Sequence, residues 1–470
     1  METLQRTANR GSISTGYDID NSLKLEIDNN EWIYRSSPTA GNRKTFTISL
    51  WLKRACLGHT PAGGDEYLAG QGSNARYHFA NDTVRFMFES NSTELESTRV
   101  LRDSSAWYHI VLAVDTTQGT AADRVKLYIN GEQQSWSNTE YPSLNQESDW
   151  MNTQNLYIGT RYAGDGDNDL AGYISEVVVL DGTQASPTDL GEYDEDSGIW
   201  KPKDLSGLTF GSEGFYYKFD NAGSLGEDSS GNGNDATLNN ITSANQATDT
   251  PTNNFCTINA LVDNGFAIWS LTEGGTRGPD TNEGNTSVGT FAVSKGKWYW
   301  EGVTTAATGL NYWKWGITRV DMQQGFSDDP GTGSAWYSAE DTFLTQTGVA
   351  SESPAYDTGI TSYTVGDIWS ISLNCDVNPY EITLRFNNSV PGTAANNTDR
   401  SVGTFASADA VMPYFFLMSS SSDNTWHNFG NPFIVTLSGG NTDENGYGDF
   451  KYAPPSGYYA LCTKNLAEFG

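Results

Sequence analysis

Two short stretches of the chain follow one pattern, and this pattern limits the folds that the chain can adopt. Residues 125–131 read VKLYING and residues 382–388 read ITLRFNN. Apolar and polar side chains alternate in both, as in a strand with one buried face. Each stretch then ends in an Asn-Gly or Asn-Asn pair, and these residues tolerate the positive φ angles of tight turns. Each stretch therefore predicts a strand that runs into a β-hairpin.

Further strands of this kind fill the first half of the chain. They are predicted at residues 45–54 (TFTISLWLKR), 107–115 (WYHIVLAVD), 155–161 (NLYIGTR), 172–182 (GYISEVVVLDG) and 214–220 (GFYYKFD). Short strands separated by turn-rich loops, with no helical period between them, indicate an antiparallel β-sandwich. The 49 Gly residues and the abundant aromatic side chains agree with an all-β chain that is rich in turns.

The length of the chain requires more than one hydrophobic core. A chain of 470 residues exceeds the roughly 100–200 residues of a typical domain. A second series of strands is predicted at residues 295–303, 312–320, 364–388 and 411–430. It follows a polar segment that is rich in Gly and Asn, which we interpret as a linker with a turn cluster.

These features predict an all-β fold of two antiparallel β-sandwiches joined by a Gly/Asn-rich linker. The predicted parts are an N-terminal arm at 1–19, a first sandwich at 20–220, a linker at 221–262, a second sandwich at 263–437 and a C-terminal extension at 438–470.

The strand motifs of the first sandwich resemble a known family. The strand WYHIVLAVD, the hairpin RVKLYING, the turn YIG and the strand GYISEVVVLDG resemble the laminin-G-like members of the concanavalin A-like lectin and glucanase superfamily. The resemblance covers residues from about 20 to 182 and implies a jelly-roll sandwich.

The motifs of the second series resemble a SPRY domain, a β-sandwich that usually binds other proteins and sometimes other ligands. The resemblance rests on W-Y-W-E in 295–303, W-G-I in 312–320, G-D before two strands, and a closing N-F-G at 428–430. One departure is the hairpin turn Asn387-Asn388, where the family usually has Asn-Gly.

The charge balance limits the kinds of partner that the chain can bind. The chain has 27 Lys and Arg against 58 Asp and Glu, a net charge of −31. It has no basic stripe, so nucleic acid is a poor partner and an anionic membrane surface equally so. We expect the acidity to keep the surface well solvated, and cation binding is the alternative.

The N-terminus and the cysteines indicate where the chain folds. The first twenty residues lack the apolar core of a signal peptide, and no later run reaches the roughly 20 apolar residues of a membrane span. The four cysteines, Cys56, Cys256, Cys375 and Cys462, form no CxxC pair. We therefore expect folding in a reducing cytoplasm, without a zinc site or disulfides.

The motifs of common catalytic sites are missing. Glucanases of the first fold place two acids on one strand as E-x-D-x-x-E, and residues 147–152 (ESDWMN) and 192–197 (EYDEDS) each lack the last Glu. His109 lies in a predicted strand and His427 precedes the closing N-F-G, so we interpret both as structural. There is no G-x-S-x-G elbow. The chain is predicted not to be an enzyme.

Two acidic loops are candidate calcium sites. Asp165, Asp167 and Asp169 present carboxylates at every second position, which could converge on Ca²⁺; loop acids in solvent are the alternative. Laminin-G-like sandwiches sometimes carry Ca²⁺ at one rim. The stretch DSSGNGND (228–235) begins like an EF-hand loop, but Asn239 stands where a bidentate Glu is needed, and a simple turn is the alternative.

Loop aromatics of the second sandwich are candidate sugar-binding residues. Trp313, Trp336 and Tyr337 lie near the Gly-rich stretch 325–339, and the faces of Trp and Tyr suit the apolar faces of sugar rings. A place in the core is the alternative for each.

The combination of parts carries a third resemblance. The two domains are accompanied by GEYDEDSGIWKPKDLSG, the DSSGNGND turn, TDTPTNNFCTIN and the ending FKYAPPSGYYALCTKNL. Together they resemble a family of structural proteins of marine bacteriophages. This resemblance implies a surface-exposed virion component, assembled in the host cytoplasm, such as a tail fibre or head fibre.

The resemblance also sets expectations for partners. It implies a non-enzymatic protein that contacts other virion proteins and binds a host surface glycan or receptor. We expect a symmetric homo-oligomer and favour a trimer. The alternatives are a capsid decoration protein with only structural contacts, or a polysaccharide-degrading enzyme whose acids meet in space but not in sequence.

Overall fold

The computed structural model shows a chain that is nearly all-β and built from antiparallel sheets, which confirms the predicted fold class. It divides into two compact units, Ser14–Asn253 and Asn254–Gly470. The described residues are 16–470 apart from 27–28, 37, 56, 58–64, 90–93, 139, 165–168, 262–270, 279–284, 305–312, 321–333, 339–342, 347–363, 391–399, 402–408, 418–424 and 433–437. Within this part of the chain, no helix is long and apolar enough to cross a membrane.

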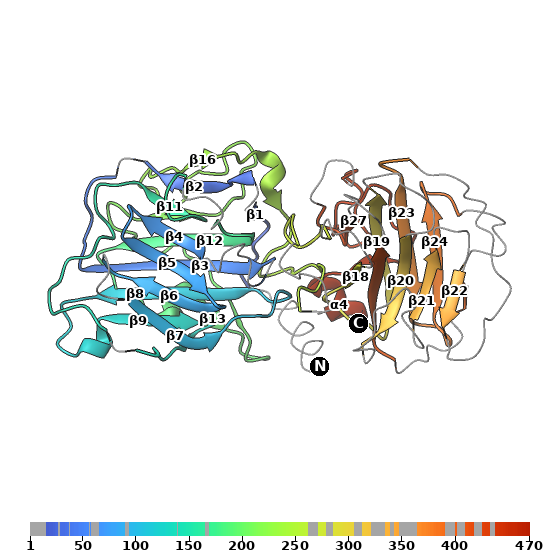
Figure 1. The fold of residues 1–470 in the computed structure, drawn as a ribbon, viewed down its shortest axis with the longest axis horizontal. Coiled ribbons are helices and arrows are strands. Elements are labelled where there is room, and N and C mark those ends of the chain that lie inside the picture. The colour runs from blue at the N-terminus through green and yellow to red at the C-terminus, as the bar shows by residue number, and fades with distance from the viewer. Residues whose placement is uncertain are drawn as a thin grey trace. The chain divides into compact units, whose positions relative to one another are not determined.

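Two sheets form the first unit (Figure 1). The eight-stranded sheet has the order β10-β9-β8-β3-β12-β1-β17, with β15 also paired to β12. Its strands are β1 (Ser22–Leu25), β3 (Thr45–Arg54), β8 (Tyr108–Asp115), β9 (Val125–Ile129), β10 (Glu132–Gln133), β12 (Gly172–Asp181), β15 (Phe215–Tyr217) and β17 (Gln246–Ala247).

The second sheet of this unit has seven strands in the order β16-β2-β11-β4-β5-β6-β7. They are β2 (Trp32–Arg35), β4 (Glu66–Gln71), β5 (Ala75–Ala80), β6 (Thr83–Met87), β7 (Glu94–Val100), β11 (Leu156–Ile158) and β16 (Thr237–Asn239). Short elements complete the unit: η2 (Ala121–Asp123), α2 (Pro187–Leu190), β13 (Gly191–Tyr193), β14 (Trp200–Pro202) and η3 (Ser243–Asn245).

The core of the first unit follows from the alternation in its strands. In β3, Phe46, Ile48, Leu50 and Leu52 are fully buried in one hydrophobic cluster with side chains from the seven-stranded sheet. Successive side chains of a strand point to opposite faces, so one face of each sheet supplies the core. The polar positions between them lie on the other face of the sheet.

The first hairpin confirms the prediction from VKLYING. β9 ends at Ile129, and Asn130 and Gly131 follow with φ angles of 49° and 80°. These two positive angles belong to a tight hairpin turn into β10. A Cβ atom at Gly131 would lie 2.5 Å from the Trp200 ring, so this position requires glycine for space as well.

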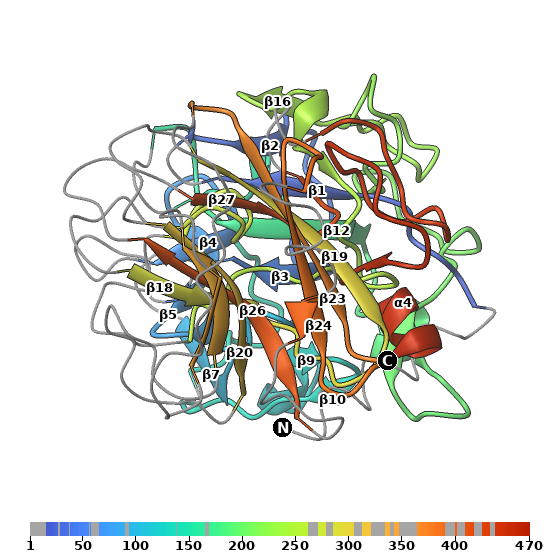
Figure 2. The ribbon, with the colours of Figure 1, turned by 90° about the vertical axis from the view of Figure 1, so that its right-hand side faces the viewer.

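Two sheets also form the second unit (Figure 2). One has the order β18-β26-β20-β21-β22, and the other has the order β25-β24-β23-β19-β27 with β28 also paired to β19. The elements are β18 (Asn285–Val288), β19 (Lys297–Thr304), β20 (Trp313–Arg319), β21 (Ser334–Ser338), β22 (Phe343–Gln346), β23 (Ile368–Asn374), β24 (Glu381–Phe386), β25 (Arg400–Ser401), β26 (Val411–Leu417), β27 (Thr425–Asn428), β28 (Tyr459–Ala460) and α4 (Thr463–Phe469).

The hairpin turn predicted from ITLRFNN is also confirmed. Asn387 and Asn388 adopt φ angles of 46° and 65°, and the Phe386 and Ser389 backbones exchange hydrogen bonds of 2.8 and 3.0 Å. Asparagine tolerates this left-handed region better than most residues, so the Asn-Asn pair performs the turn without a glycine.

The structure corrects two predicted domain boundaries. Residues 221–253, predicted as part of a linker, belong to the first unit, because β16 pairs with β2 and β17 pairs with β1. Residues 438–470, predicted as an extension, belong to the second unit, because β28 pairs with β19 and Leu466 of α4 lies in its core. Buried polar contacts hold both segments in their units. The polar composition of the segments does not reveal these contacts in the sequence.

The predicted N-terminal arm is described only from residue 16 onward, and this part contacts the first sandwich. The backbone N–H of Ile19 donates to the Thr252 hydroxyl at 3.0 Å, and the Tyr17 hydroxyl lies 3.1 Å from the Tyr216 hydroxyl. Both tyrosines donate to the buried carboxylate of Glu176 in β12. Residues 1–15, which include most of the arm, lie outside the described residues.

The Glu176 carboxyl gives the first unit a pH-dependent stability. Burial raises its pKa to about 7, above the value of about 4.3 in an unfolded chain. Its contribution is complete below about pH 4 and is lost as the pH rises through about 7, with a slope of up to about 1.4 kcal/mol per pH unit. We expect Glu176→Gln to flatten this fall between about pH 4 and about pH 7. Urea unfolding followed by hydrogen exchange of β3 and β12 peptides measures it, with the exposed Glu227→Gln as control. Equal slopes in wild type and Glu176→Gln would contradict it.

Candidate functional site

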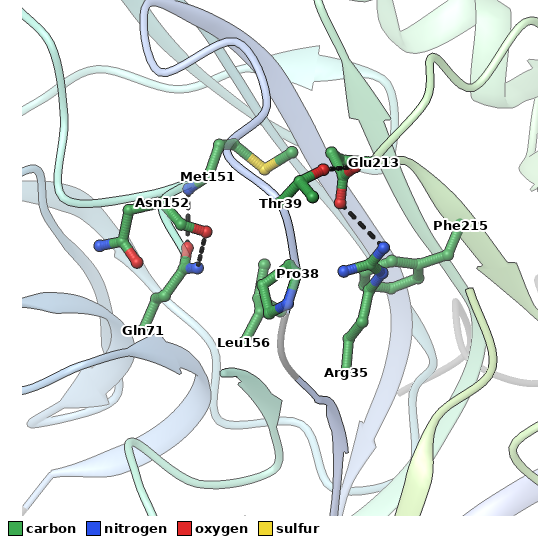
Figure 3. Close-up of a pocket in the computed structure, with 9 residues that line it drawn as sticks. All are labelled: Arg35, Pro38, Thr39, Gln71, Met151, Asn152, Leu156, Glu213 and Phe215. Atoms are coloured by element: carbon green, nitrogen blue, oxygen red, sulfur yellow. Dashed lines mark hydrogen bonds and ion pairs between the residues drawn. The ribbon is translucent and has the colours of Figure 1, made fainter. Parts of the chain in front are cut away.

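One end of the first sandwich carries a pocket, which we call the rim pocket (Figure 3). The end of β2, the end of β4 and the start of β11 meet there, because Leu156 pairs with both Arg35 and Gln71 in the sheet. The start of β15 and two loops complete it. The pocket has about 210 Å³ of free space, part of it open to solvent. Its lining residues are Arg35, Pro38, Thr39, Gln71, Met151, Asn152, Leu156, Glu213 and Phe215.

The Arg35 guanidinium is the main polar group of the rim pocket. Its Nη2 lies 2.8 Å from Glu213 Oε2 and donates to Asn234 Oδ1 at 2.5 Å. The side chains of Arg35 and Glu213 are only 12% and 11% exposed. The Thr39 hydroxyl also donates to Glu213 (Figure 3). Among the described residues, Arg35 Nε and Nη1 are buried and have no hydrogen-bond partner.

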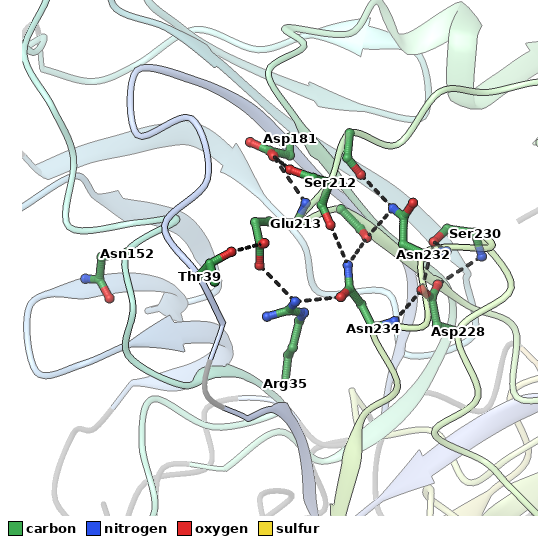
Figure 4. A network of polar contacts seen from close by, with 12 residues as sticks. Arg35, Thr39, Asn152, Asp181, Ser212, Glu213, Asp228, Ser230, Asn232 and Asn234 are labelled. Atoms are coloured by element: carbon green, nitrogen blue, oxygen red, sulfur yellow. Dashed lines mark hydrogen bonds and ion pairs between the residues drawn. The ribbon is translucent and has the colours of Figure 1, made fainter.

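A turn from another part of the chain holds this arginine in place (Figure 4). The amide groups of Asn232 and Asn234 donate to the carbonyls of residues 211, 212 and 214 at 2.6–3.1 Å. The segment that bears Glu213 is therefore fixed by the turn at 228–235. Arg35 then connects the turn to the end of β2.

The same turn decides how DSSGNGND should be interpreted. Asp228 Oδ1 accepts the N–H groups of Tyr216 and Ser230, both at 2.9 Å. Its Oδ2 accepts the Ser230 hydroxyl and the Asn234 N–H, both at 2.8 Å. A carboxylate that accepts several local donors forms an Asx-type turn, so the stretch is the simple turn and not an EF-hand-like loop.

The opposite wall of the rim pocket is held by Gln71. Its Nε2 donates to the carbonyls of Asn152 and Gln154 at 3.1 and 2.7 Å, and its Oε1 accepts the Met151 N–H at 2.7 Å. The side chain thus uses three of its hydrogen-bonding positions on the loop. Gln71 positions this wall rather than offering free groups to a ligand.

The charged groups of the rim pocket are engaged within the chain. Its one carboxylate, Glu213, is paired with Arg35 and accepts from Thr39, so it is not free to act as a general base. The Arg35 Nε and Nη1 groups are covered by the chain, so the exposed residue of the lining is Thr39.

The predicted calcium loop is only partly described. Asp165 and Asp167 lie outside the described residues, and Asp169 is 1% exposed just before β12. The convergence of the three carboxylates therefore stays a prediction. Across the described residues, no group of three or more His, Cys, Asp or Glu side chains is arranged to hold a metal ion.

The predicted sugar-binding aromatics fall in two paired strands. Trp313 lies in β20, and Trp336 and Tyr337 lie in β21, where they pair with Gly316 and Trp315. Their side chains lie outside the described part of the structure, so their role in sugar binding stays a prediction. The loop residues 325–333 also lie outside it.

The two histidines interpreted as structural are buried. His109 accepts a 2.9 Å hydrogen bond from Trp200 Nε1, and burial lowers its pKa to about 3. The centroids of the His427 and Phe415 rings are 3.7 Å apart, and burial lowers the pKa of His427 to about 3. Both are neutral at physiological pH and enclosed by aromatic side chains.

The key residues of the rim pocket gave no signal in the sequence. Arg35, Glu213 and Asn234 are far apart in the chain, and none belongs to a recognisable motif on its own. Of the segments around the pocket, only the stretch DSSGNGND carries a sequence pattern, which indicates a turn or a cation-binding loop. Its distant partner Arg35 depends on which strands are neighbours in the sheet.

Comparison with protein families supports the lectin-like character of the first unit. Residues 28–187 match the family described as the concanavalin A-like lectin/glucanases superfamily. This match covers most of the first unit and less than half of the chain. A search of curated proteins gave no match.

Several solved structures are similar at low identity. A protein of Bacteroides ovatus described as a candidate carbohydrate-binding protein is 19% identical with a TM-score of 0.33; the match covers 47% of this chain and 59% of that one. The SPRY domain of human HERC1 is 13% identical with a TM-score of 0.24, over 31% of this chain and 83% of that one. The heptameric SAP-like pentraxin from Limulus polyphemus is 14% identical with a TM-score of 0.28, over 37% and 82%.

Proposed function

We propose that this protein is a non-enzymatic glycan-binding component of a bacteriophage virion, exposed on the particle surface. In this proposal the first sandwich binds a host surface glycan through the rim pocket. The protein is a tail fibre, head fibre or similar appendage, and it assembles with other virion proteins as a symmetric homo-oligomer, a trimer in the first instance.

The observation that carries the glycan-binding part is the family match together with the rim pocket. Residues 28–187 match a lectin family, and the rim pocket lies within the same unit with Thr39 exposed in its lining. A hydroxyl side chain can donate and accept hydrogen bonds, as the hydroxyl groups of a sugar do.

The virion part of the proposal is supported by the sequence resemblance. The linking stretches GEYDEDSGIWKPKDLSG and TDTPTNNFCTIN resemble those of phage structural proteins together with both domains. A capsid decoration protein is the second candidate, and it shares every feature except the use of the rim pocket. A polysaccharide-degrading enzyme is the third, and it would need a pair of acids about 5–10 Å apart in a groove.

A glycan array with the purified full-length chain tests the proposal. We expect binding to a bacterial surface glycan by wild type and a loss of at least about tenfold in affinity for Arg35→Gln, which removes the charged donor. Arg99→Gln is the matched control, because it removes one positive charge from a side chain that is 38% exposed and paired with Glu132 outside the pocket. Circular dichroism verifies that both variants fold.

Three outcomes separate the candidates. Binding lost in Arg35→Gln and kept in Arg99→Gln supports the proposal. Absence of binding to any glycan or host cell favours the decoration protein, and shortening of a bound polysaccharide favours the enzyme. Binding that is lost with a chelator and in Asp167→Ala would assign recognition to the predicted calcium loop instead of the rim pocket.

A further inference from the structure

A short segment before β1 is held on the first unit by a few hydrogen bonds. We call this segment, residues 17–21, the strap. The backbone N–H of Ile19 donates to Thr252 Oγ1 at 3.0 Å, and the same hydroxyl donates to the Ile19 carbonyl at 3.0 Å. The Ile19 side chain is buried, whereas Asp18 and Asp20 are exposed. The strap therefore lies on the sandwich without being a strand of its sheets.

The acid that the strap contacts has an unusual backbone. Glu176 lies at a β-bulge of β12, where the register shifts between Ser175 and Val178, and its φ angle is 50°. A bulge re-aims a side chain, and left-handed angles of residues such as glutamate occur often at switch regions. Here Glu176 Oε2 accepts from the Tyr17 hydroxyl at 3.4 Å, and Ser175 Oγ donates to the Asn21 carbonyl at 3.2 Å. Both ends of the strap therefore contact the bulge.

The groups that face the Glu176 carboxyl come from the strap and from the segment at β15. Tyr17 and Tyr216 both donate to it. Lys218 Nζ lies 5.7 and 5.9 Å from the centres of these two rings and favours the charged form, whereas Asp220 disfavours it. Glu176 is only 3% exposed, and this burial raises its pKa to about 7 despite the two hydroxyl donors.

We propose that the strap is a pH-sensitive latch, which is closed at low pH and leaves the sandwich as Glu176 loses its proton. When the strap is closed, Tyr17 helps to keep water from the carboxyl, and the protonated acid is favoured. When the strap is open, the carboxylate regains water, and the ionised form is favoured. A rise in pH therefore shifts the equilibrium toward the open strap. Below about pH 4 the acid is protonated in both states, so the shift occurs between about pH 4 and about pH 7.

Hydrogen exchange at the Ile19 amide of the full chain tests the latch. This amide is hydrogen-bonded to Thr252 in the closed strap. Its protection, measured against the exchange rate of an unstructured peptide at the same pH, is expected to fall at least about fivefold from pH 5 to pH 7.5. At every pH it should be lower than that of β3 amides, which exchange when the whole unit unfolds. Equal protection at Ile19 and in β3 would show that the strap does not open by itself, and this would overturn the proposal.

A substitution of the acid identifies the group that controls the latch. In Glu176→Gln the side chain keeps its size and has no proton to lose, so the protection at Ile19 is expected not to change between pH 5 and pH 7.5. Glu227→Gln is the control, because Glu227 is exposed, and it should behave as wild type. A fall in Glu176→Gln as large as that of wild type would overturn the proposal.

Substitutions of Tyr17 test the strap from the other side. Tyr17→Ala is expected to reduce the fall in the free energy of unfolding of the first unit between about pH 4 and about pH 7, because the Glu176 carboxyl is then open to water in the folded unit. Tyr17→Phe keeps the ring and is expected to retain the fall. Urea unfolding at several pH values measures both variants. An equal fall in Tyr17→Ala and wild type would show that the strap does not shield Glu176 and would overturn the proposal.

Discussion

Replacing Asp249 by alanine is expected to lower the free energy of unfolding of the first unit by about 3–5 kcal/mol. Asp249 Oδ2 lies 2.6 Å from Lys53 Nζ, and both side chains are at most 1% exposed. Its Oδ1 accepts a 2.9 Å hydrogen bond from Trp107 Nε1. The substitution leaves an ammonium group buried without its carboxylate, which costs more than the ion pair itself contributes.

The measurement is urea unfolding of the full chain, with hydrogen exchange of β3 and β8 peptides as the report on the first unit. Asp220→Ala is the control, because Asp220 is 56% exposed and its nearest oxygen is 3.8 Å from Lys218. The double variant Lys53→Met with Asp249→Leu should recover much of the loss, since it removes both charges together. A change below about 1 kcal/mol in Asp249→Ala would show that 246–250 does not hold this unit together.

Replacing Glu301 by alanine is expected to destabilise the second unit by about 3–5 kcal/mol. The Glu301 side chain is fully buried in β19 and accepts the backbone N–H groups of Lys451 and Tyr452 at 2.8 and 2.9 Å. It also accepts the Tyr299 hydroxyl at 2.9 Å. Removal of this acceptor leaves several buried donors without a partner at the place where the C-terminal segment crosses the sheet.

Thiol labelling reports on the second unit directly. Cys256, Cys375 and Cys462 are buried there, so in a Cys56→Ser background their reaction with a thiol reagent in urea follows the unfolding of this unit. Glu444→Ala is the control, because Glu444 is exposed on the same C-terminal segment. Equal labelling midpoints for Glu301→Ala and Glu444→Ala would contradict the role assigned to Glu301.

The strands and hairpins of this protein could be predicted because their signals are local. The period of two in 45–54 predicts β3 residue by residue, and the Asn-Gly and Asn-Asn pairs predict two turns with positive φ angles. These features depend only on neighbours in the chain. They do not depend on which strands become partners.

The domain boundaries and the rim pocket depend on such distant partners. The segment 221–253 is polar, yet Asn245 donates to Lys24 and Glu31, and Asp249 pairs with Lys53. Composition alone assigns such a segment to a linker because it does not show that the polar groups are buried and satisfied. Arg35 and Glu213 meet for the same reason, through the packing of the two sheets.

Hydrogen exchange with and without the strongest glycan found on the array tests the central claim most directly. The rim pocket account predicts slower exchange in peptides that cover 35–41, 151–156 and 211–215, with no comparable change elsewhere in the chain. Protection confined to other segments, such as β20 and β21 of the second unit or the loop at 165–169, would contradict it.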